Sequence, residues 1–144
     1  MLIMSKVLDI LAAQLNPVVG DINGNLALAR EAYAETRTRD ADLLVLSELF
    51  ILGYPAEDLV LKPSAVELSM AAVQTLAGET AGGPAILIGC PWEVDGKVHN
   101  SSVLLKDGIV AGRCDKRELP NYGVFDEKRI FAPGDGAPFV FTLK

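Results

Sequence analysis

A glutamate that comes two positions after a run of apolar residues is the first side chain whose type and position suit catalysis. Glu48 comes after residues 43–46, which are all leucine or valine. Such a run is typical of a strand buried on both faces, and open α/β sheets bind their ligands at the carboxyl ends of these strands. A carboxylate buried there could act as a general base and then as a general acid. Position alone, however, favours the simpler interpretation of a solvated glutamate at a strand exit.

A second stretch combines a lysine with aromatic and acidic residues. Lys116 ends a strand-like segment shortly before Pro120, and its ammonium could stabilise a developing oxyanion. A lone lysine is more often a surface residue. Tyr122 and residues 125–127, which are Phe, Asp and Glu, lie in the same loop. Loops rich in such groups often carry binding sites, so this clustering predicts one here.

The elements that would position these groups alternate between strands and helices. Short apolar runs predict strands, and apolar residues repeating every three or four positions predict amphipathic helices, the first of them capped by Asp21 or Asn23. Two-residue Asp-Gly turns predict hairpins that join the later strands into an antiparallel meander. The predicted strands span residues 7–15, 43–46, 85–89, 98–105, 109–114 and 139–143, and the predicted helices span roughly 22–36 and 63–78. This order predicts an α/β fold.

The chain is expected to form a single unit over residues 1–144 that is incomplete at its C-terminus. No repeat or linker divides it, and 144 residues is an ordinary length for one domain. The last predicted strand, residues 139–143, stops at Lys144 without a turn or a cap. We therefore expect the chain to end within the fold.

Composition excludes several classes of partner and location. The chain has 13 basic and 19 acidic residues, a net charge of −6, and no long basic cluster, which argues against binding nucleic acid. No apolar run approaches the roughly 20 residues needed to cross a membrane. Two cysteines are too few for a disulfide framework, and the first residues lack the features of a signal peptide. These features predict a cytoplasmic protein without a membrane partner.

Several common catalytic devices are also excluded. The chain has one histidine, His99, and its two cysteines, Cys90 and Cys114, are far apart, so we expect no metal site. A single histidine in a predicted strand also argues against a serine–histidine–aspartate triad. The glycine-rich phosphate loop that ends in Gly-Lys-Ser or Gly-Lys-Thr does not occur.

Three stretches of the sequence together resemble a known family. The first is Ala13-Gln14-Leu15-Asn16, followed by Val19-Gly20-Asp21 and Asn25, and the second is Leu46-Ser47-Glu48-Leu49-Phe50, followed by Gly53-Tyr54-Pro55. They resemble the carbon-nitrogen hydrolase, or nitrilase, superfamily. The run from Lys116 to Glu127, continuing to Arg129, Phe131 and Pro133-Gly134, is similar to the glutaminase domains of glutamine-dependent NAD synthetases. The resemblance covers nearly the whole chain and implies a nitrilase-like sandwich of α-β-β-α layers.

The resemblance also implies roles for individual residues. Glu48 matches the proton acceptor of the family, and Lys116 matches the lysine that stabilises the oxyanion. Tyr122 matches a position that contacts glutamine, and Glu127 a second acidic residue that orients the site. The nucleophile of the family is a cysteine that lies further along the sequence and is not in this chain. Neither Cys90 nor Cys114 has the expected neighbours, so we interpret both as structural.

The implied reaction is the hydrolysis of glutamine to glutamate and ammonia. In the family the ammonia is used by a further domain, which amidates nicotinate adenine dinucleotide to NAD with ATP and magnesium; this part needs no cofactor of its own. We expect the complete protein to be a homo-oligomer and this chain alone to be inactive. A stand-alone amidase of the same superfamily and a non-catalytic binding module with the same fold are the alternatives.

Overall fold

A computed structural model describes residues 7–136 and 138–143 of the chain. Its centre is a five-stranded sheet in which the strands lie in the order of the sequence. The first three strands are parallel and the last two continue the sheet antiparallel. The strands are β1 (Ile10–Ala12), β2 (Leu43–Val45), β3 (Ala85–Val94), β4 (Lys97–Lys106) and β5 (Ile109–Asp115). The predicted α/β class is therefore confirmed.

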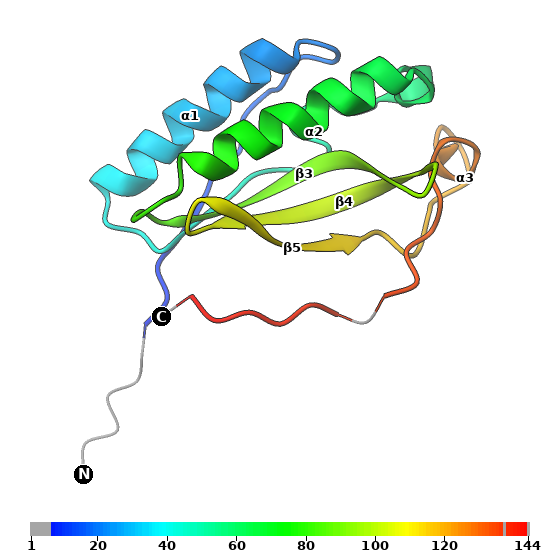
Figure 1. Cartoon of the computed structure of the whole chain (residues 1–144). Coiled ribbons are helices and arrows are strands. Elements are labelled where there is room, and N and C mark those ends of the chain that lie inside the picture. The colour runs from blue at the N-terminus through cyan, green and yellow to red at the C-terminus, as the bar shows by residue number, and fades with distance from the viewer. Residues whose placement is uncertain (1–6, 137, 144) are drawn as a thin grey trace.

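Two long helices cover one face of the sheet. Helix α1 (Ile22–Thr38) connects β1 to β2, and helix α2 (Pro63–Gly78) connects β2 to β3 after a short 3-10 helix, η1 (Glu57–Leu61). Both crossovers step in the same direction along the sheet. Because parallel crossovers are right-handed, both helices must lie on the same face, as Figure 1 shows. Among the described residues, no helix is both long and apolar enough to cross a membrane.

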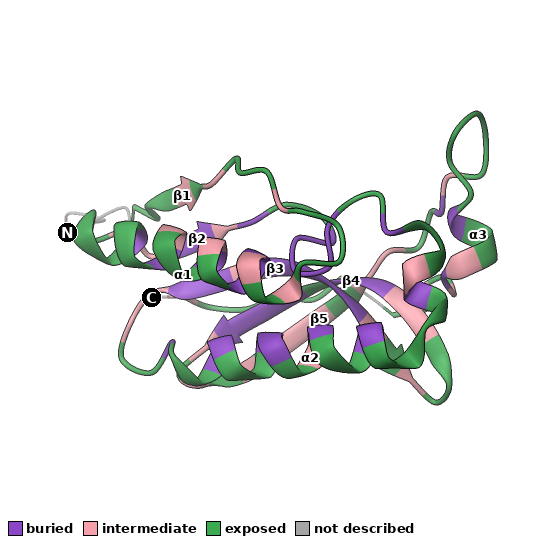
Figure 2. Ribbon diagram, turned by 90° about the horizontal axis from the view of Figure 1, so that it is seen from above, coloured by how far each residue is buried: buried purple, intermediate pink, exposed green. Residues whose placement is uncertain are grey.

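The main core lies between these helices and the sheet. The predicted apolar face of α1 is confirmed, because Leu26, Ala29 and Tyr33 are buried there. They pack with alternate residues of the central strands, among them Leu44 and Ile86. Figure 2 shows the buried residues along the inner sides of the helices and the central strands. The described residues thus form one helix layer and one sheet of the predicted sandwich.

Local signals for the ends of elements are also confirmed. The side chain of Asp21 caps α1 by accepting a hydrogen bond from Gly24 N at 3.0 Å, and Pro63 is the first residue of α2. Asp95 and Gly96 both have positive φ, at 50° and 74°, as a two-residue hairpin turn requires. The Asp107-Gly108 turn has the same geometry.

Two predicted strands differ from the structure. The strand expected over residues 7–15 is limited to Ile10–Ala12, because its partner β2 has only three residues to pair with it. The strand expected over residues 139–143 is wrong. This segment crosses the sheet face away from the helices (Figure 1), and Lys106 Nζ donates to Thr142 O at 2.9 Å. Its residues have strand-like types, but none of the described strands pairs with it, and a strand requires such a partner.

A buried asparagine joins the loops that follow β1 and β2. Asn25, at the start of α1, accepts a hydrogen bond from Val18 N at 2.8 Å. Its amide donates to Val18 O at 2.8 Å and to Ile51 O at 3.1 Å. Only 1% of Asn25 is exposed, so no water can replace these bonds. The residue therefore anchors the segment that carries Glu48 to the N-terminal end of α1.

We predict that Asn25→Leu lowers the free energy of unfolding by about 2–4 kcal/mol, because it leaves buried backbone groups of Val18 and Ile51 without partners. The matched control is Asn23→Leu, two residues earlier in the same helix, where the side chain is exposed. Urea unfolding of the 144-residue chain measures both. Equal stability of the two variants would contradict the role assigned to Asn25.

Candidate active site

Glu48 lies on a loop that leaves β2 and passes over β3. Leu46 N donates to Leu87 O at 2.9 Å, and Ile51 N donates to Gly89 O at 3.3 Å, so the loop stays against the sheet. A Cβ atom at Gly89 would overlap the backbone of Ser47 and Leu49. Gly89 is therefore required for the loop to come this close.

The turn after Glu48 is held by buried residues. Leu49 has a φ of 48°, a left-handed conformation that is uncommon for leucine. Gly53 N donates to Leu49 O at 2.7 Å and closes the turn. Phe50 and Leu52 are fully buried within it and anchor it to the two cores. These contacts give the backbone at Glu48 a fixed position.

Lys116 follows β5 and is fixed through its backbone on both sides. Its N–H donates to Asn100 O on β4 at 2.8 Å, and its carbonyl accepts from Gly134 N at 2.9 Å. The intervening loop leads to the short helix α3 (Glu127–Ile130). Glu127 N donates to Pro120 O at 3.1 Å, which brings the start of α3 back beside Lys116.

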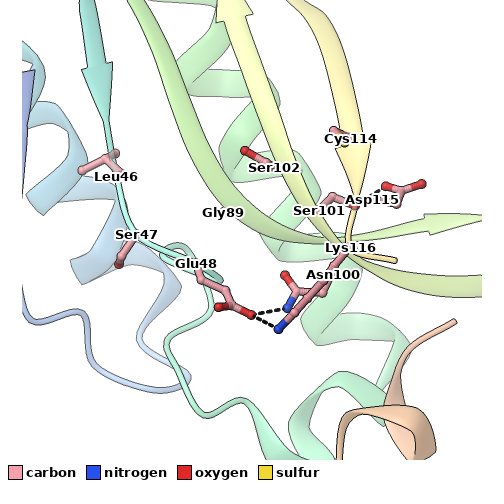
Figure 3. Close-up of a pocket in the computed structure, with 10 residues that line it drawn as sticks. All are labelled: Leu46, Ser47, Glu48, Gly89, Asn100, Ser101, Ser102, Cys114, Asp115 and Lys116. Atoms are coloured by element: carbon pink, nitrogen blue, oxygen red, sulfur yellow. Dashed lines mark hydrogen bonds and ion pairs between the residues drawn. The ribbon is translucent and has the colours of Figure 1, made fainter. Parts of the chain in front are cut away.

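The three charged residues meet at one point, as their assignment to one site predicted. Lys116 Nζ donates to Glu48 Oε1 at 2.8 Å and to Glu127 Oε1 at 3.0 Å. Figure 3 shows the Glu48 carboxylate and the Lys116 ammonium turned toward each other, the first from the loop after β2 and the second from the end of β5. Because β2 and β5 run in the same direction, their carboxyl ends lie at the same end of the sheet. The topology therefore brings together groups that are 68 residues apart.

Exposure differs strongly among the three side chains. The side chain of Glu127 is 6% exposed, that of Lys116 30% and that of Glu48 46%. Glu48 is therefore solvent-accessible, as the simpler interpretation of its position predicted, and the buried base considered as the alternative is not found, because the loop places the carboxylate beside a pocket. Glu127 Oε2 lies 2.9 Å from Lys116 Nζ, but among the described residues it receives no hydrogen bond of good geometry. Its partner is thus the positive charge of the ammonium.

The two carboxylates keep Lys116 charged. Partial burial acts to lower the pKa of this ammonium, but the hydrogen bonds to Glu48 and Glu127 and their negative charges outweigh burial. The pKa of Lys116 is therefore raised above the ordinary lysine value of 10.5. A lysine in this state is a fixed positive charge at neutral pH, which suits stabilisation of an oxyanion rather than proton transfer.

A pocket of about 330 Å³ opens beside Glu48 and Lys116. It lies on the sheet face away from the helices. Ser102, which lines it, is two residues from Leu104 and so points to the same face, where Leu104 packs beside Leu143 of the C-terminal segment. The remaining lining includes Ser47, Gly89 and Asn100. The charged groups are therefore presented to a space that could admit a small polar molecule.

Sequence reasoning missed Asn100. Its side-chain amide donates to Glu48 Oε1 at 2.6 Å, and only 4% of the residue is exposed. The signal available in the sequence was a polar residue within the predicted strand 98–105, which by itself does not indicate what the side chain faces.

The two cysteines occupy different environments. Cys90 is buried in the core under the helices, and burial raises the pKa of its thiol, so it is unreactive there. Cys114 is exposed and lines the pocket, but it lies higher on β5, apart from the contact between Glu48 and Lys116 in Figure 3.

The other residues singled out in the sequence lie outside the charged cluster. Tyr122 is 71% exposed and packs edge-on against Phe125, with ring centres 5.6 Å apart. Phe125 lines a second pocket, of about 490 Å³, which Glu127 also borders. The contact between Tyr122 and glutamine stays a prediction. His99 is partly buried, with Nδ1 3.0 Å from Ala132 O, and takes no part in the site.

The sequence and the fold of the chain are similar to those of known proteins. A family model described as carbon-nitrogen hydrolase matches residues 10–144. The glutamine-dependent NAD(+) synthetase of Thermotoga maritima is 44% identical over 131 residues, which cover 90% of this chain and 23% of that protein. A solved structure of the glutamine-dependent NAD+ synthetase from Acinetobacter baumannii aligns with a TM-score of 0.88 and 36% identity, covering 94% of this chain and 26% of that one.

A smaller protein of known structure is also similar. An amidase from Nesterenkonia sp. aligns with a TM-score of 0.81 and 29% identity, covering 94% of this chain and 51% of the amidase. A variant of that amidase has been solved with acrylamide added to its active-site cysteine. The chain thus spans about a quarter of the synthetases and about half of the amidase.

The raised pKa of Lys116 leads to a test of the cluster. We predict that Glu48→Gln and Glu127→Gln each lower the pH at which Lys116 loses its proton, because each removes one negative charge beside the ammonium. Glu118→Gln, at an exposed carboxylate of the same loop, is the matched control and should leave that pH unchanged. Competitive acylation of the lysines between pH 9 and 12, followed by mass spectrometry, reports the midpoint for Lys116.

The raised pKa of Lys116 also makes the stability of the folded chain depend on pH. Because the pKa is raised in the folded chain, the stabilisation from charged Lys116 is fully present below pH 10.5, and it is lost as the pH rises through the folded value.

Identical acylation midpoints in wild type and both cluster variants would show that the three groups do not interact in solution.

Proposed function

Because this chain belongs to the carbon-nitrogen hydrolase family, we propose that it carries the acid–base and oxyanion groups of a glutamine-hydrolysing site. The observation that carries the proposal is the cluster in which the Lys116 ammonium contacts both Glu48 and Glu127 beside an open pocket. The thiol that completes the site would come from a cysteine outside this chain, since neither Cys90 nor Cys114 contacts the cluster.

The first half of the reaction would form a thioester. Glu48 takes the proton of the thiol, the sulfur attacks the side-chain carbonyl carbon of glutamine, and the carbonyl oxygen becomes an oxyanion. The fixed charge of Lys116 stabilises that oxyanion. The protonated Glu48 then gives its proton to the amide nitrogen, the carbon–nitrogen bond breaks, and ammonia leaves.

The second half would release glutamate. A water molecule attacks the thioester carbon while Glu48 again takes a proton, and Lys116 again stabilises the oxyanion. The carbon–sulfur bond breaks, and the proton on Glu48 returns to the thiolate. Glu48 is therefore unchanged over one turnover, which requires a carboxylate that water and substrate can reach; its half-exposed position supports this role.

Glu127 and Tyr122 would have supporting roles. Glu127 is buried and ion-paired with Lys116, which suits a residue that orients the ammonium rather than one that exchanges protons. Tyr122 is exposed on the loop before Glu127, where it could contact glutamine entering the pocket.

We further propose that the ammonia serves NAD synthesis. The relatives at 44% and 36% identity are named glutamine-dependent NAD synthetases, and the chain matches about a quarter of each. Within such a protein the partners would be nicotinate adenine dinucleotide, ATP and magnesium, bound by residues beyond this segment, and the protein would be a cytoplasmic homo-oligomer. The likeness to the Nesterenkonia amidase supports a stand-alone amidase as the second candidate, since the same cluster would serve it.

The isolated 144-residue chain should not hydrolyse glutamine, because Glu48 and Lys116 have no suitable thiol to activate. Release of glutamate by the purified chain measures this. Turnover that disappears in Cys90→Ala or Cys114→Ala would identify that cysteine as the nucleophile and overturn the assignment.

A chimera can test the complete reaction. In it, this chain replaces the matching segment of the Thermotoga maritima synthetase, which supplies the remaining sequence. We predict that Glu48→Gln in the chimera lowers glutamine-dependent NAD formation by roughly 10²–10⁴-fold, the range for loss of a general base. NAD formation from added ammonia should persist, because it bypasses the thioester. Glu118→Gln is the control for a neutralised carboxylate.

The outcomes separate the candidates. Equal loss with glutamine and with ammonia would reject Glu48 as the base for glutamine hydrolysis. An unsubstituted chimera that uses ammonia but not glutamine would reject the glutaminase proposal for this chain and favour the amidase.

A further inference from the structure

Asn100 contacts both charged residues that the proposed reaction uses. Its side-chain amide donates to Glu48 Oε1 at 2.6 Å, and its backbone carbonyl accepts from Lys116 N at 2.8 Å. Asn100 lies near the start of β4, between β3 and β5, where it is almost fully buried. One rigid strand therefore holds the positions of the base and of the cation.

The two carboxylate oxygens of Glu48 have different hydrogen-bond partners. Oε1 accepts hydrogen bonds from both Asn100 Nδ2 and Lys116 Nζ, at 2.6 Å and 2.8 Å. Among the described residues, none donates a hydrogen bond to Oε2. The carboxylate is thus fixed through one oxygen, and the other remains available to take a proton.

We propose that Asn100 is a positioning residue for glutamine hydrolysis: its amide fixes Oε1 of Glu48, so that Oε2 is the oxygen that accepts the proton of the thiol. This inference rests on the proposed function. The thiol is the one that the longer protein supplies, and the proton moves from its sulfur to Oε2 as the carbon–sulfur bond forms.

The chemistry of the side chain suits this task. Glu48 is half exposed and could otherwise adopt several rotamers, with only the flexible Lys116 side chain to hold it. An amide donates to the carboxylate without adding a charge that would compete with the oxyanion for Lys116. A carboxylate at position 100 would have nearly the same shape but would repel Glu48 or share its proton.

The contact itself can be tested in the 144-residue chain, without any activity. The side-chain amide protons of Asn100 should resonate downfield of ordinary asparagine amides, because one of them lies in a short bond to a carboxylate. Glu48→Gln should move that signal upfield, whereas Glu118→Gln should not. An Asn100 signal that does not respond to Glu48→Gln would overturn the proposal whatever the protein catalyses.

The catalytic consequence can be tested in the chimera. Asn100→Leu should lower the kcat for glutamine by about 10–100-fold, as expected when one hydrogen bond to a charged group is lost. KM should change less, and ammonia-dependent NAD formation should persist.

Asn100→Asp separates positioning from mere packing. If Asn100 only filled space, the isosteric aspartate would be milder than leucine. If Asn100 positions Glu48, Asn100→Asp should instead lower the activity more than Asn100→Leu near neutral pH, because aspartate also adds a negative charge beside Glu48. Asn23→Leu is the control for the exposed helix surface. Full glutamine activity in Asn100→Asp would overturn the proposal.

Failure of this inference and failure of the proposed function remain distinct. A chimera that cannot use glutamine even without substitutions would reject glutamine hydrolysis, while the amide signal of Asn100 would still decide whether it holds Glu48. An active chimera whose Asn100 variants keep the wild-type kcat for glutamine would reject the positioning role alone.

Discussion

The ammonium of Lys116 between two carboxylates is the interaction on which the rest of the site depends. Its partners come from the loop after β2 and from the start of α3. A carboxylate as buried as Glu127 is costly without a positive partner, so the cluster forms only when three separate segments meet. The site therefore exists only in the folded chain, where the loop after β2, the end of β5 and the start of α3 come together.

The sheet topology places these segments within reach. Strands β2 and β5 run in the same direction but are separated by β3 and β4, a lateral distance of about 14 Å at the usual strand spacing. Two features close that distance. The loop after β2 lies directly over β3, where Gly89 has no side chain, and the long Lys116 side chain extends from the end of β5 toward Glu48.

Precise placement of these charged groups depends in addition on buried polar contacts. Asn25 holds the Glu48 loop from the helix side, and Asn100 holds Glu48 from the sheet side. Long charged side chains alone leave many rotamers available, whereas buried amides have few alternatives because each lost bond is costly. The arrangement accordingly leaves one oxygen of Glu48 free at the mouth of a pocket and keeps Glu127 enclosed.

The sequence by itself determined the elements and the identities of the charged residues. Apolar periodicity located both long helices and the central strands, and the Asp21 cap and the Asp-Gly turns marked their ends, because these signals act between neighbours in the chain. Glu48, Lys116 and Glu127 could be singled out as residue types in motifs. The strand expected over residues 139–143 was wrong because strand formation depends on a partner that residue types do not reveal.

Only the tertiary structure decided how these groups meet. It showed that Glu48 is half exposed rather than buried, that its carboxylate shares Lys116 with Glu127, and that Asn100 holds one of its oxygens. It also showed that Gly89 must be a glycine, because another segment crosses it. All of these depend on contacts between residues distant in the sequence, and hydrogen-bond partners over such separations are set by strand order and loop path, which no local pattern encodes.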